Sequence, residues 1–238
     1  MPTVVILVGG YATRLYPVTK TVPKSMLKVA GKPFIAHQLD LLNKNGISKV
    51  IICSWYLSEQ IENYVGDGKD FGLSVKFSID GEKPLGTGGA IKKALPLLDD
   101  IFFVLYGDSY LTVSFKDVYD FFLSLNTQGL MTVFRNNDEW DKSNIIFKSG
   151  KIIRYDKTEK TSDMQYIDYG LSILRKSAFD CVGDQEIFDL VTLFNLLIGR
   201  GQMVGYEVMK RFYEIGSPRG LSETEDYLLH LKKGNGDI

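Results

Sequence analysis

The chain has 238 residues, and its 28 Lys and Arg against 29 Asp and Glu give a formal net charge of −1. A near-neutral chain lacks the strongly basic surface that attracts nucleic acids and anionic membranes, so we expect neither as a partner. With 45% hydrophobic and 24% charged residues, the composition is typical of a soluble globular protein. The two cysteines, Cys53 and Cys181, lie far apart, which indicates buried thiols rather than a disulfide framework or a zinc site.

Apolar segments of the chain are too short to cross a membrane as helices. The longest runs, such as Val4–Val8 and Ile101–Tyr106, have the length of a strand, whereas a membrane helix needs roughly 20 residues. No basic region precedes the first of these runs, so no signal peptide is predicted. We therefore expect a cytoplasmic protein.

Expected strands and helices alternate through the first half of the chain. Thr3–Val8 is a continuous apolar, β-branched run that ends at Gly9-Gly10, which is typical of a strand buried on both faces of a parallel sheet. Further strands are expected at Lys49–Ser54, Ser74–Ile79, Ile101–Gly107 and Leu130–Phe134. Helices are expected from Pro33 to about Gly46, Ser58 to Gly66, Gly86 to Leu95, and Ser114 or Asp117 to about Leu125. This order predicts an α/β fold with a doubly wound, mainly parallel, Rossmann-like sheet.

More β-structure is expected in the second half. Asn144–Phe147 and Lys151–Tyr155 flank a Ser149-Gly150 turn and predict a β-hairpin. After them we expect a long strand at Tyr166–Leu174, a helix near Ile187–Ile198, a strand at Met203–Val208, a helix at about Ser222–Lys232 and a polar tail over 233–238. No linker or composition shift divides the chain, so we expect one domain over residues 1–238, with the hairpin inserted over the edge of the sheet.

Ligands of open parallel sheets bind at the carboxyl ends of the strands, and the first candidate site follows the first strand. There Gly9 and Gly10 precede Arg14 and Lys24 in one loop. Glycine lets backbone N–H groups approach a phosphate closely, while an arginine and a lysine supply the charge that phosphate oxygens attract. The loop is not a P-loop, because no Gly-Lys-Ser/Thr follows, and it lacks the third glycine of a dinucleotide fingerprint.

A second glycine-rich turn, Pro84–Ala90, follows two carboxylates, Asp80 and Glu82. Such a turn can lie flat against a planar base, and a carboxylate can accept two hydrogen bonds from the N1–H and amino group of guanine. Uracil, thymine and adenine do not offer that pair of donors. Among the bases, this cluster therefore favours guanine, and a solvated acidic turn is the alternative.

A carboxylate also ends a hydrophobic strand in the third cluster, Tyr106-Gly107-Asp108-Ser109. Mg²⁺ prefers carboxylate and phosphate oxygens, so Asp108 is a candidate magnesium ligand, with a turn cap as the alternative. The histidines His37 and His230 look like helix-face residues and receive no role.

The segment from Leu7 to Thr19, continued by Pro23-Lys24-Ser25-Met26, closely resembles the signature of the sugar-1-phosphate nucleotidyltransferases. This resemblance extends through nearly the whole chain. Two further segments, Tyr166–Ser172 and Phe212–Leu221, look most like the branch that makes GDP-D-glycero-α-D-manno-heptose. The family usually has Gly where this chain has Ala12.

The resemblance implies sites for a nucleoside triphosphate, a sugar 1-phosphate and Mg²⁺. The nucleotide is expected at Leu7, Gly9, Gly10, Tyr11, Ala12, Thr13, Arg14, Asp80, Glu82, Pro84, Gly86, Thr87 and Asp108. The sugar phosphate is expected at Lys24, Asn144, Lys157, Tyr169 and Gly170. Mg²⁺ is expected at Asp108 and at Glu214, which stands where many relatives carry Asp and would bind directly or through water. Arg14, Lys24 and Asp108 are the expected catalytic residues.

The implied reaction is nucleotidyl transfer to the sugar 1-phosphate, with GTP and D-glycero-α-D-manno-heptose 1-phosphate as the favoured pair. Mannose or glucose 1-phosphate with GTP, CTP or UTP is the alternative within enzymes. A regulatory subunit that binds a nucleotide without turnover is the alternative outside them. Some relatives carry a C-terminal β-helix of hexapeptide repeats, which we do not expect here, and a homodimer through the second-half strands is compatible with the sequence without being indicated by it.

Overall fold

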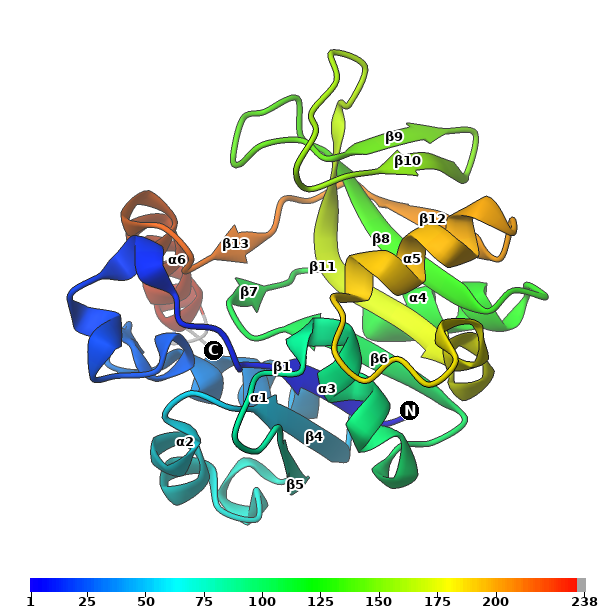
Figure 1. Cartoon of the computed structure of the whole chain (residues 1–238). Helices are drawn as coiled ribbons and strands as arrows, with labels where there is room; N and C mark the ends of the chain where they lie inside the picture. Colours follow the sequence, from blue (N-terminus) through cyan, green and yellow to red (C-terminus); the bar gives the residue numbers. More distant parts are fainter. Residues whose placement is uncertain (235–238) are drawn as a thin grey trace.

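The computed structural model describes residues 1–234 and builds them around a nine-stranded sheet (Figure 1). Its strands are β1 (Val4–Leu7), β4 (Lys49–Ser54), β5 (Ser74–Ile79), β6 (Ile101–Tyr106), β8 (Gly129–Arg135), β9 (Ile145–Lys148), β10 (Lys151–Tyr155), β11 (Tyr166–Arg175) and β12 (Met203–Val208). They lie in the order β5-β4-β1-β6-β11-β8-β12-β10-β9. The end of the expected polar tail, 235–238, lies outside the described residues.

The α/β class with a mainly parallel sheet is confirmed. Strands β5, β4, β1 and β6 are parallel neighbours, and β8 is parallel to β12. Strands β10 and β11 run against the others, and β11 lies between β6 and β8. The predicted hairpin, β9 and β10, does not lie over the edge of the sheet as expected. It extends the sheet, because Lys151 of β10 pairs with Val204 of β12.

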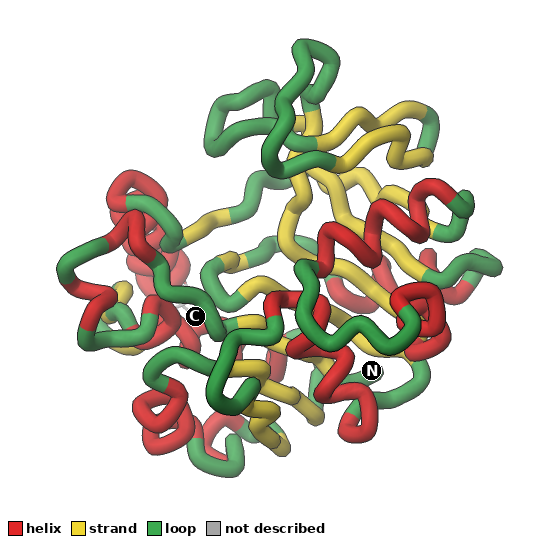
Figure 2. The backbone as a smooth tube through the Cα atoms, viewed as in Figure 1, coloured by secondary structure: helices red, strands yellow, loops and turns green. Residues whose placement is uncertain are grey.

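Helices cover both faces of the sheet (Figure 2). They are α1 (Phe34–Lys44), α2 (Ser58–Val65), α3 (Gly86–Ala94), α4 (Phe115–Leu123), α5 (Leu190–Gly199) and α6 (Pro218–Gly234). Val4 and Ile6 of β1 share a core with α1, α2 and α4, while Val5 shares another with α3 and α5. Burial of both faces of β1 explains why its sequence is continuously apolar.

Two helices begin at residues other than those predicted. Helix α6 begins at Pro218 rather than near Ser222, because the Ser217 hydroxyl accepts the Gly220 N–H at 2.9 Å and caps the first turn. Helix α5 begins at Leu190 rather than Ile187. The residues before it form a loop in which the Phe188 carbonyl accepts the N–H groups of Gly88 and Gly89 at the start of α3.

Two short strands that we did not predict, β7 (Ser109–Tyr110) and β13 (Tyr213–Glu214), form a separate antiparallel pair. Their register places Ser109 opposite Glu214. This pairing joins the turn after β6 to the segment before α6, far away in the sequence. Within residues 1–234, no helix combines the length and the apolar character needed to cross a bilayer.

Candidate active site

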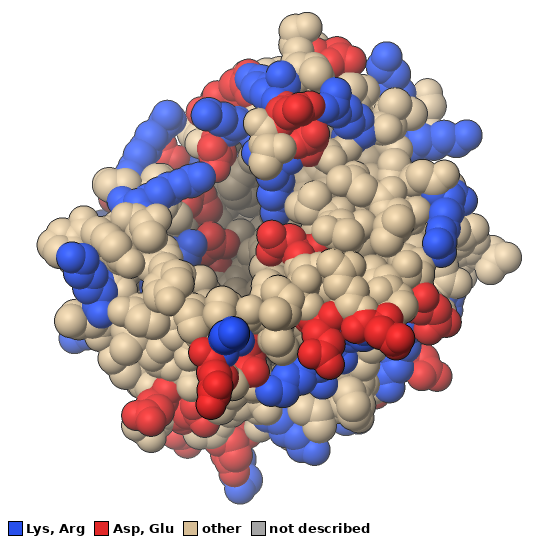
Figure 3. All heavy atoms as spheres, viewed as in Figure 1, with Lys and Arg blue, Asp and Glu red and all other residues tan. Residues whose placement is uncertain are grey.

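Two cavities open at the carboxyl ends of the parallel strands. The first, of about 350 Å³, lies between the glycine loop after β1, the end of β4 and the start of α3. The second, of about 660 Å³, is bordered by the loop at residues 12–14, by β11 and by the segment around Glu214. Lys24, Tyr106 and Asp108 line both. Figure 3 shows acidic and basic side chains gathered around a hollow on this face.

Most of the residues predicted to bind a nucleotide meet at these cavities. The first is lined by Leu7, Gly9, Gly10, Tyr11, Asp80, Pro84, Gly86, Thr87 and Asp108. Ala12, Thr13 and Arg14 line the second. Glu82 lines neither, because it lies on an exposed part of the turn. Trp55 and Asp189 also line the first cavity and were missed, since neither belongs to a glycine-rich or charged motif.

Asp80 has one carboxylate oxygen committed and one without a partner. Its Oδ2 accepts the N–H of Leu85 at 2.9 Å, while Oδ1 is buried and has no hydrogen-bond partner within residues 1–234. Burial raises the pKa of this carboxyl, against the opposing effects of the Leu85 N–H and of Lys93. A buried oxygen without a partner is rare in native proteins, so a donor from a ligand would satisfy it.

The glycines at the start of α3 allow close packing against the loop before α5. A Cβ on Gly86, whose φ is +73°, would lie 2.6 Å from the Phe188 carbonyl oxygen. On Gly89 it would lie 2.1 Å from the carbonyl oxygen of Glu186. Side chains at these positions would therefore push away the loop before α5, a constraint that the sequence does not reveal because the loop is distant along the chain.

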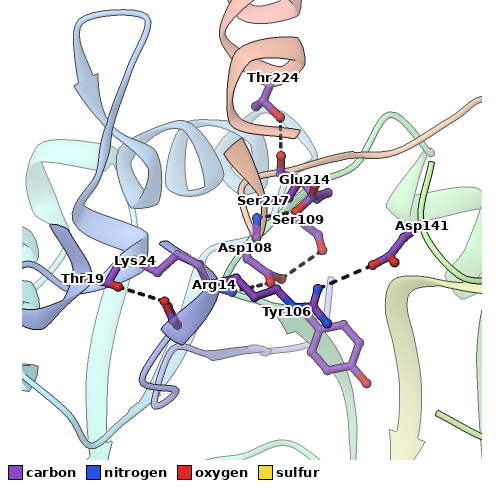
Figure 4. A network of polar contacts seen from close by, with 12 residues as sticks. Arg14, Thr19, Lys24, Tyr106, Asp108, Ser109, Asp141, Glu214, Ser217 and Thr224 are labelled. Atoms are coloured by element: carbon purple, nitrogen blue, oxygen red, sulfur yellow. Dashed lines mark hydrogen bonds and ion pairs between the residues drawn. The ribbon is translucent and has the colours of Figure 1, made fainter. Parts of the chain in front are cut away.

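Ala12 adopts the left-handed conformation, with φ 50° and ψ 48°, which explains why glycine is usual at this position. A non-glycine residue there costs about 1–2 kcal/mol. The Ala12 carbonyl accepts the Thr19 hydroxyl at 2.8 Å, which holds the turn (Figure 4). The next charged residue, Arg14, is largely exposed, and its Nη1 lies 3.9 Å from Asp141 Oδ2 on the opposite side of the second cavity.

Lys24 and Asp108 form an ion pair where the cavities meet. Lys24 Nζ donates to Asp108 Oδ2 at 2.7 Å, and the side chains are 24% and 31% exposed (Figure 4). Burial raises the pKa of Asp108, but the charge and hydrogen bond of Lys24 outweigh it, so the pKa lies below its ordinary value. The carboxyl is therefore ionised at neutral pH.

The second predicted metal ligand, Glu214, faces the same place. Its Oε1 accepts the Ser217 hydroxyl at 2.7 Å, and its Oε2 accepts the N–H of Gly216. A Cβ on Gly216 would lie 2.8 Å from Glu214 Oε2, 3.5 Å from Asp108 Oδ2 and 3.8 Å from Lys24 Nζ. Both carboxylates therefore lie close to the Gly216 backbone, and a side chain at this position would collide with Glu214.

Mg²⁺ suits this donor set, because it is usually held by one or two carboxylates together with waters and substrate phosphates. Within residues 1–234, no cluster of three or more His, Cys, Asp or Glu side chains could hold a metal ion. Waters and phosphate oxygens would therefore complete the coordination of a metal held by Asp108 and Glu214.

The residues predicted to bind the sugar phosphate all line the second cavity: Lys24, Asn144, Lys157, Tyr169 and Gly170. The Tyr169 ring is buried, and its hydroxyl accepts the Thr112 N–H at 3.1 Å, so this side chain serves the core. Asn144 Oδ1 accepts the N–H of Asp168 at 3.0 Å and ties β11 to the start of the hairpin.

Asp156, next to Lys157, resembles a sugar-phosphate ligand of the family, but its carboxylate is committed to its own loop. Its Oδ1 accepts the N–H groups of Thr158 and Glu159, each at 2.9 Å, and its Oδ2 accepts Arg154 at 3.0 Å. Together these bonds hold the pKa of Asp156 well below its ordinary value. The loop that presents Lys157 is therefore fixed by its neighbouring acid.

Comparison with known families shows which family this chain belongs to. The family model described as nucleotidyl transferase matches residues 3–179, which is well over half of the chain. The chain belongs to the nucleotidyl transferase family. Both cavities are built largely from the matched region, and the residues contributed from beyond it are Asp189, Phe212, Glu214 and Gly216.

Individual relatives agree with this nucleotidyl transferase assignment. The mannose-1-phosphate guanyltransferase of Saccharomyces cerevisiae is 31% identical over 96% of the chain, which spans 65% of that relative. The crystal structure of HddC from Yersinia pseudotuberculosis complexed with GMP-PN has a TM-score of 0.79 at 26% identity and covers 96% of this chain and 100% of its own. A Bacillus anthracis structure described as a glucose-1-phosphate thymidylyltransferase, with a TM-score of 0.84 at 20% identity and 94% coverage of both chains, supports the fold alone.

Proposed function

We propose that this protein transfers a nucleotidyl group from a nucleoside triphosphate to a sugar 1-phosphate and releases pyrophosphate. The observation that carries the proposal is the Lys24–Asp108 ion pair at the junction of two cavities, because it puts a cation where two phosphate-bearing substrates would meet. In the proposal, the nucleoside occupies the first cavity and the sugar phosphate the second.

The reaction needs little more than positioning and charge neutralisation. An oxygen of the sugar phosphate forms a bond to the α-phosphorus, the bond from that phosphorus to the β-phosphate oxygen breaks, and pyrophosphate leaves with its electrons. A phosphomonoester has a second pKa near 6, so the nucleophile is already an anion at neutral pH and no general base is required. Arg14 would neutralise the departing pyrophosphate, Lys24 the α-phosphate and attacking oxygen, and Lys157 the sugar phosphate.

Mg²⁺ belongs to this proposal as the cofactor, held by Asp108 together with Glu214. When bound, it would neutralise phosphate charge and hold phosphate oxygens in place. The two carboxylates would contribute the negative charge that attracts the ion, and both lie close to Gly216.

Guanine is the base that we propose for the first cavity. The buried Asp80 Oδ1 lacks a donor, and guanine offers adjacent N1–H and amino donors to a carboxylate. Support comes also from the relatives, which are named guanyltransferases, and from HddC, which was solved with GMP-PN.

For the sugar, we propose D-glycero-α-D-manno-heptose 1-phosphate, on the resemblance of Tyr166–Ser172 and Phe212–Leu221 to the branch that makes the GDP-heptose. Mannose 1-phosphate is the second candidate, favoured by the names of the relatives. The same catalytic residues would serve either sugar.

Pyrophosphate release with Mg²⁺ tests the proposal across a grid of four nucleoside triphosphates and the 1-phosphates of the heptose, mannose and glucose. Release confined to GTP with the heptose or mannose phosphate supports the guanylyltransferase and identifies the sugar. Release with another base keeps the reaction and overturns the role of Asp80. Tight nucleotide binding without release in any combination points to a non-catalytic subunit. Asp108→Asn is the blank.

Equivalent substitutions at Asp80 and Glu82 test which of the two carboxylates binds the base. Asp80→Asn keeps an oxygen acceptor for the Leu85 N–H but loses the charge, and we expect GTP affinity to fall by at least about 10-fold. Glu82→Gln makes the same chemical change on the exposed part of the turn and should leave affinity unchanged. Isothermal titration calorimetry with GTP measures both. Equal affinities in the two variants contradict the assignment of Asp80.

A further inference from the structure

Tyr106, two residues before Asp108, connects the two sides of the site. Its hydroxyl lies 3.3 Å from Lys157 Nζ and 3.1 Å from Asp168 Oδ2. The Lys157 ammonium also lies 4.8 Å from the centroid of the Tyr106 ring, within the range of a cation–π contact. Sequence analysis did not assign a role to Tyr106 or to Asp168.

The direction of this hydrogen-bond chain is fixed by the groups in it. An ammonium only donates and an ionised carboxylate only accepts, so Lys157 donates to the Tyr106 oxygen and the hydroxyl proton points to Asp168. A phenolic hydroxyl ordinarily keeps its proton at neutral pH, so it can accept from Lys157 and donate to Asp168 at the same time. The two hydrogen bonds therefore lead from the Lys157 ammonium through the Tyr106 hydroxyl to the Asp168 carboxylate.

Further hydrogen bonds hold the Asp168 carboxylate in place. Its Oδ1 accepts the N–H of Gly170 at 3.1 Å, and its Oδ2 also accepts the Tyr155 hydroxyl at 2.9 Å. The register between β11 and β8 shifts between Asp168 and Ser172, and Gly170 has a φ of +104°. Asp168 itself still pairs with Val133 of β8, just before this irregularity, and it lines the second cavity.

Lys157, by contrast, is an exposed residue in the loop after β10. A free lysine side chain loses rotamer freedom when it binds a ligand, which weakens binding unless the side chain is held beforehand. The Tyr106 hydroxyl uses one of the three ammonium protons, and the others remain for phosphate oxygens.

We propose that Tyr106 is a positioning residue, anchored by Asp168, that holds the Lys157 ammonium at the second cavity ready for the sugar phosphate. The proposal rests on the proposed function in one respect, which is that Lys157 binds the sugar phosphate. It adds a specific cause for the placement of that lysine.

Tyr106→Phe tests the proposal, because it keeps the ring and its contact with Lys157 but removes the hydroxyl. We expect the KM for the sugar 1-phosphate to rise about 10-fold, while the KM for GTP changes little. Tyr155→Phe is the matched control. It removes the other hydroxyl on Asp168 Oδ2, although that hydroxyl makes no hydrogen bond to Lys157 among the described residues. Its KM values should stay near those of the wild type, and equal effects of the two variants would overturn the proposal.

A second measurement does not depend on turnover. Limited acetylation with acetic anhydride, read by mass spectrometry, reports how freely the Lys157 amine reacts, with Lys116 on α4 as an internal reference. Lys157 should react faster in Tyr106→Phe than in the wild type, and at the wild-type rate in Tyr155→Phe. Unchanged labelling of Lys157 in Tyr106→Phe overturns the positioning role even if the enzyme is active. Absence of pyrophosphate release from the wild type contradicts the proposed function instead.

Discussion

The Lys24 ammonium lies 2.7 Å from Asp108 Oδ2. The pair bridges the loop after β1 and the turn after β6, two segments that follow adjacent parallel strands. In the proposed reaction, a phosphate oxygen would compete with Asp108 for the same ammonium, so substrate binding would loosen this contact. The ion pair thus keeps the cation in place without leaving the carboxylate unpaired.

Removal of the Lys24 charge should nearly abolish the reaction. Loss of one preorganised charge or donor at a transition state typically costs about 10²–10³ in rate, so we expect a fall of that size in kcat for Lys24→Ala. Lys116→Ala is the control, since it removes a lysine that pairs with Asp120 on the surface of α4 and should retain full activity. Pyrophosphate release measures the rate, and circular dichroism verifies the fold. A folded Lys24→Ala variant with wild-type turnover contradicts the assignment.

A substitution at Gly10 should lower GTP affinity without lowering the stability of the protein. A Cβ at Gly10 would meet no atom within 4 Å, and its φ is not positive, so Gly10→Ala should leave the free energy of unfolding within about 1 kcal/mol of the wild type. If backbone N–H groups of this loop contact phosphate, the added methyl group should still lower GTP affinity. Gly199→Ala, also without neighbours within 4 Å, is the control at the end of α5. Calorimetry that gives equal GTP affinity for both variants would exclude close phosphate approach at Gly10.

The sequence was sufficient for elements whose pattern is local. β1, β4 and β6 are buried on both faces, so their apolar runs identified them directly. The β7–β13 pair could not be predicted, because two-residue strands have no periodicity and their pairing depends on the rest of the fold. The start of α6 was misplaced because Pro218 resembles a helix breaker, whereas it stands at the first helical position after the Ser217 cap.

For the candidate site, local motifs located the loops but not all of the contacts. The glycine loop after β1 and the strand-end residue Asp108 come together at the cavities, as their positions after parallel strands predict. The difference between Asp80 and Glu82 comes from the turn geometry, which partly buries Asp80 at the first cavity and exposes Glu82. No role was predicted for Tyr106 or Asp168, because neither belongs to a recognisable local motif. Their hydrogen bond forms only when the fold brings β6 and β11 together.

The two cysteines should differ in reactivity. Cys53 is buried beside the first cavity, and burial, with a smaller effect from Asp80, raises its pKa to about 12. Since the thiolate is the reactive form, Cys53 should resist a thiol reagent at pH 8 until the protein unfolds. Cys181 is only partly buried and should react first. Titration of the native protein with Ellman's reagent, with Cys181→Ser and Cys53→Ser compared, tests this order. Rapid modification of Cys53 in the native Cys181→Ser variant would contradict it.

His37 should make stability depend on pH below neutrality. Burial lowers its pKa, and the charges of Lys32 and Lys232 lower it further, against the opposing effects of the Val29 carbonyl, 2.7 Å from Nε2, and of Asp40. The folded state therefore favours the neutral ring. In the unfolded chain, a histidine titrates near pH 6.5.

The direction in which the free energy of unfolding changes with pH follows from the number of protons that the folded and unfolded states bind. Between the unfolded pKa of about 6.5 and the lower folded value, the unfolded chain holds the extra proton, so the free energy of unfolding falls as pH falls, by at most about 1.4 kcal/mol per pH unit for one group. Above this window His37 is neutral in both states and adds no slope. Urea unfolding at pH 5.5, 6, 7 and 8 should show the decline in the wild type and a flatter profile in His37→Gln. His230→Gln, at an exposed position on α6, should keep the wild-type profile. A wild-type slope in His37→Gln would show that other groups cause the decline.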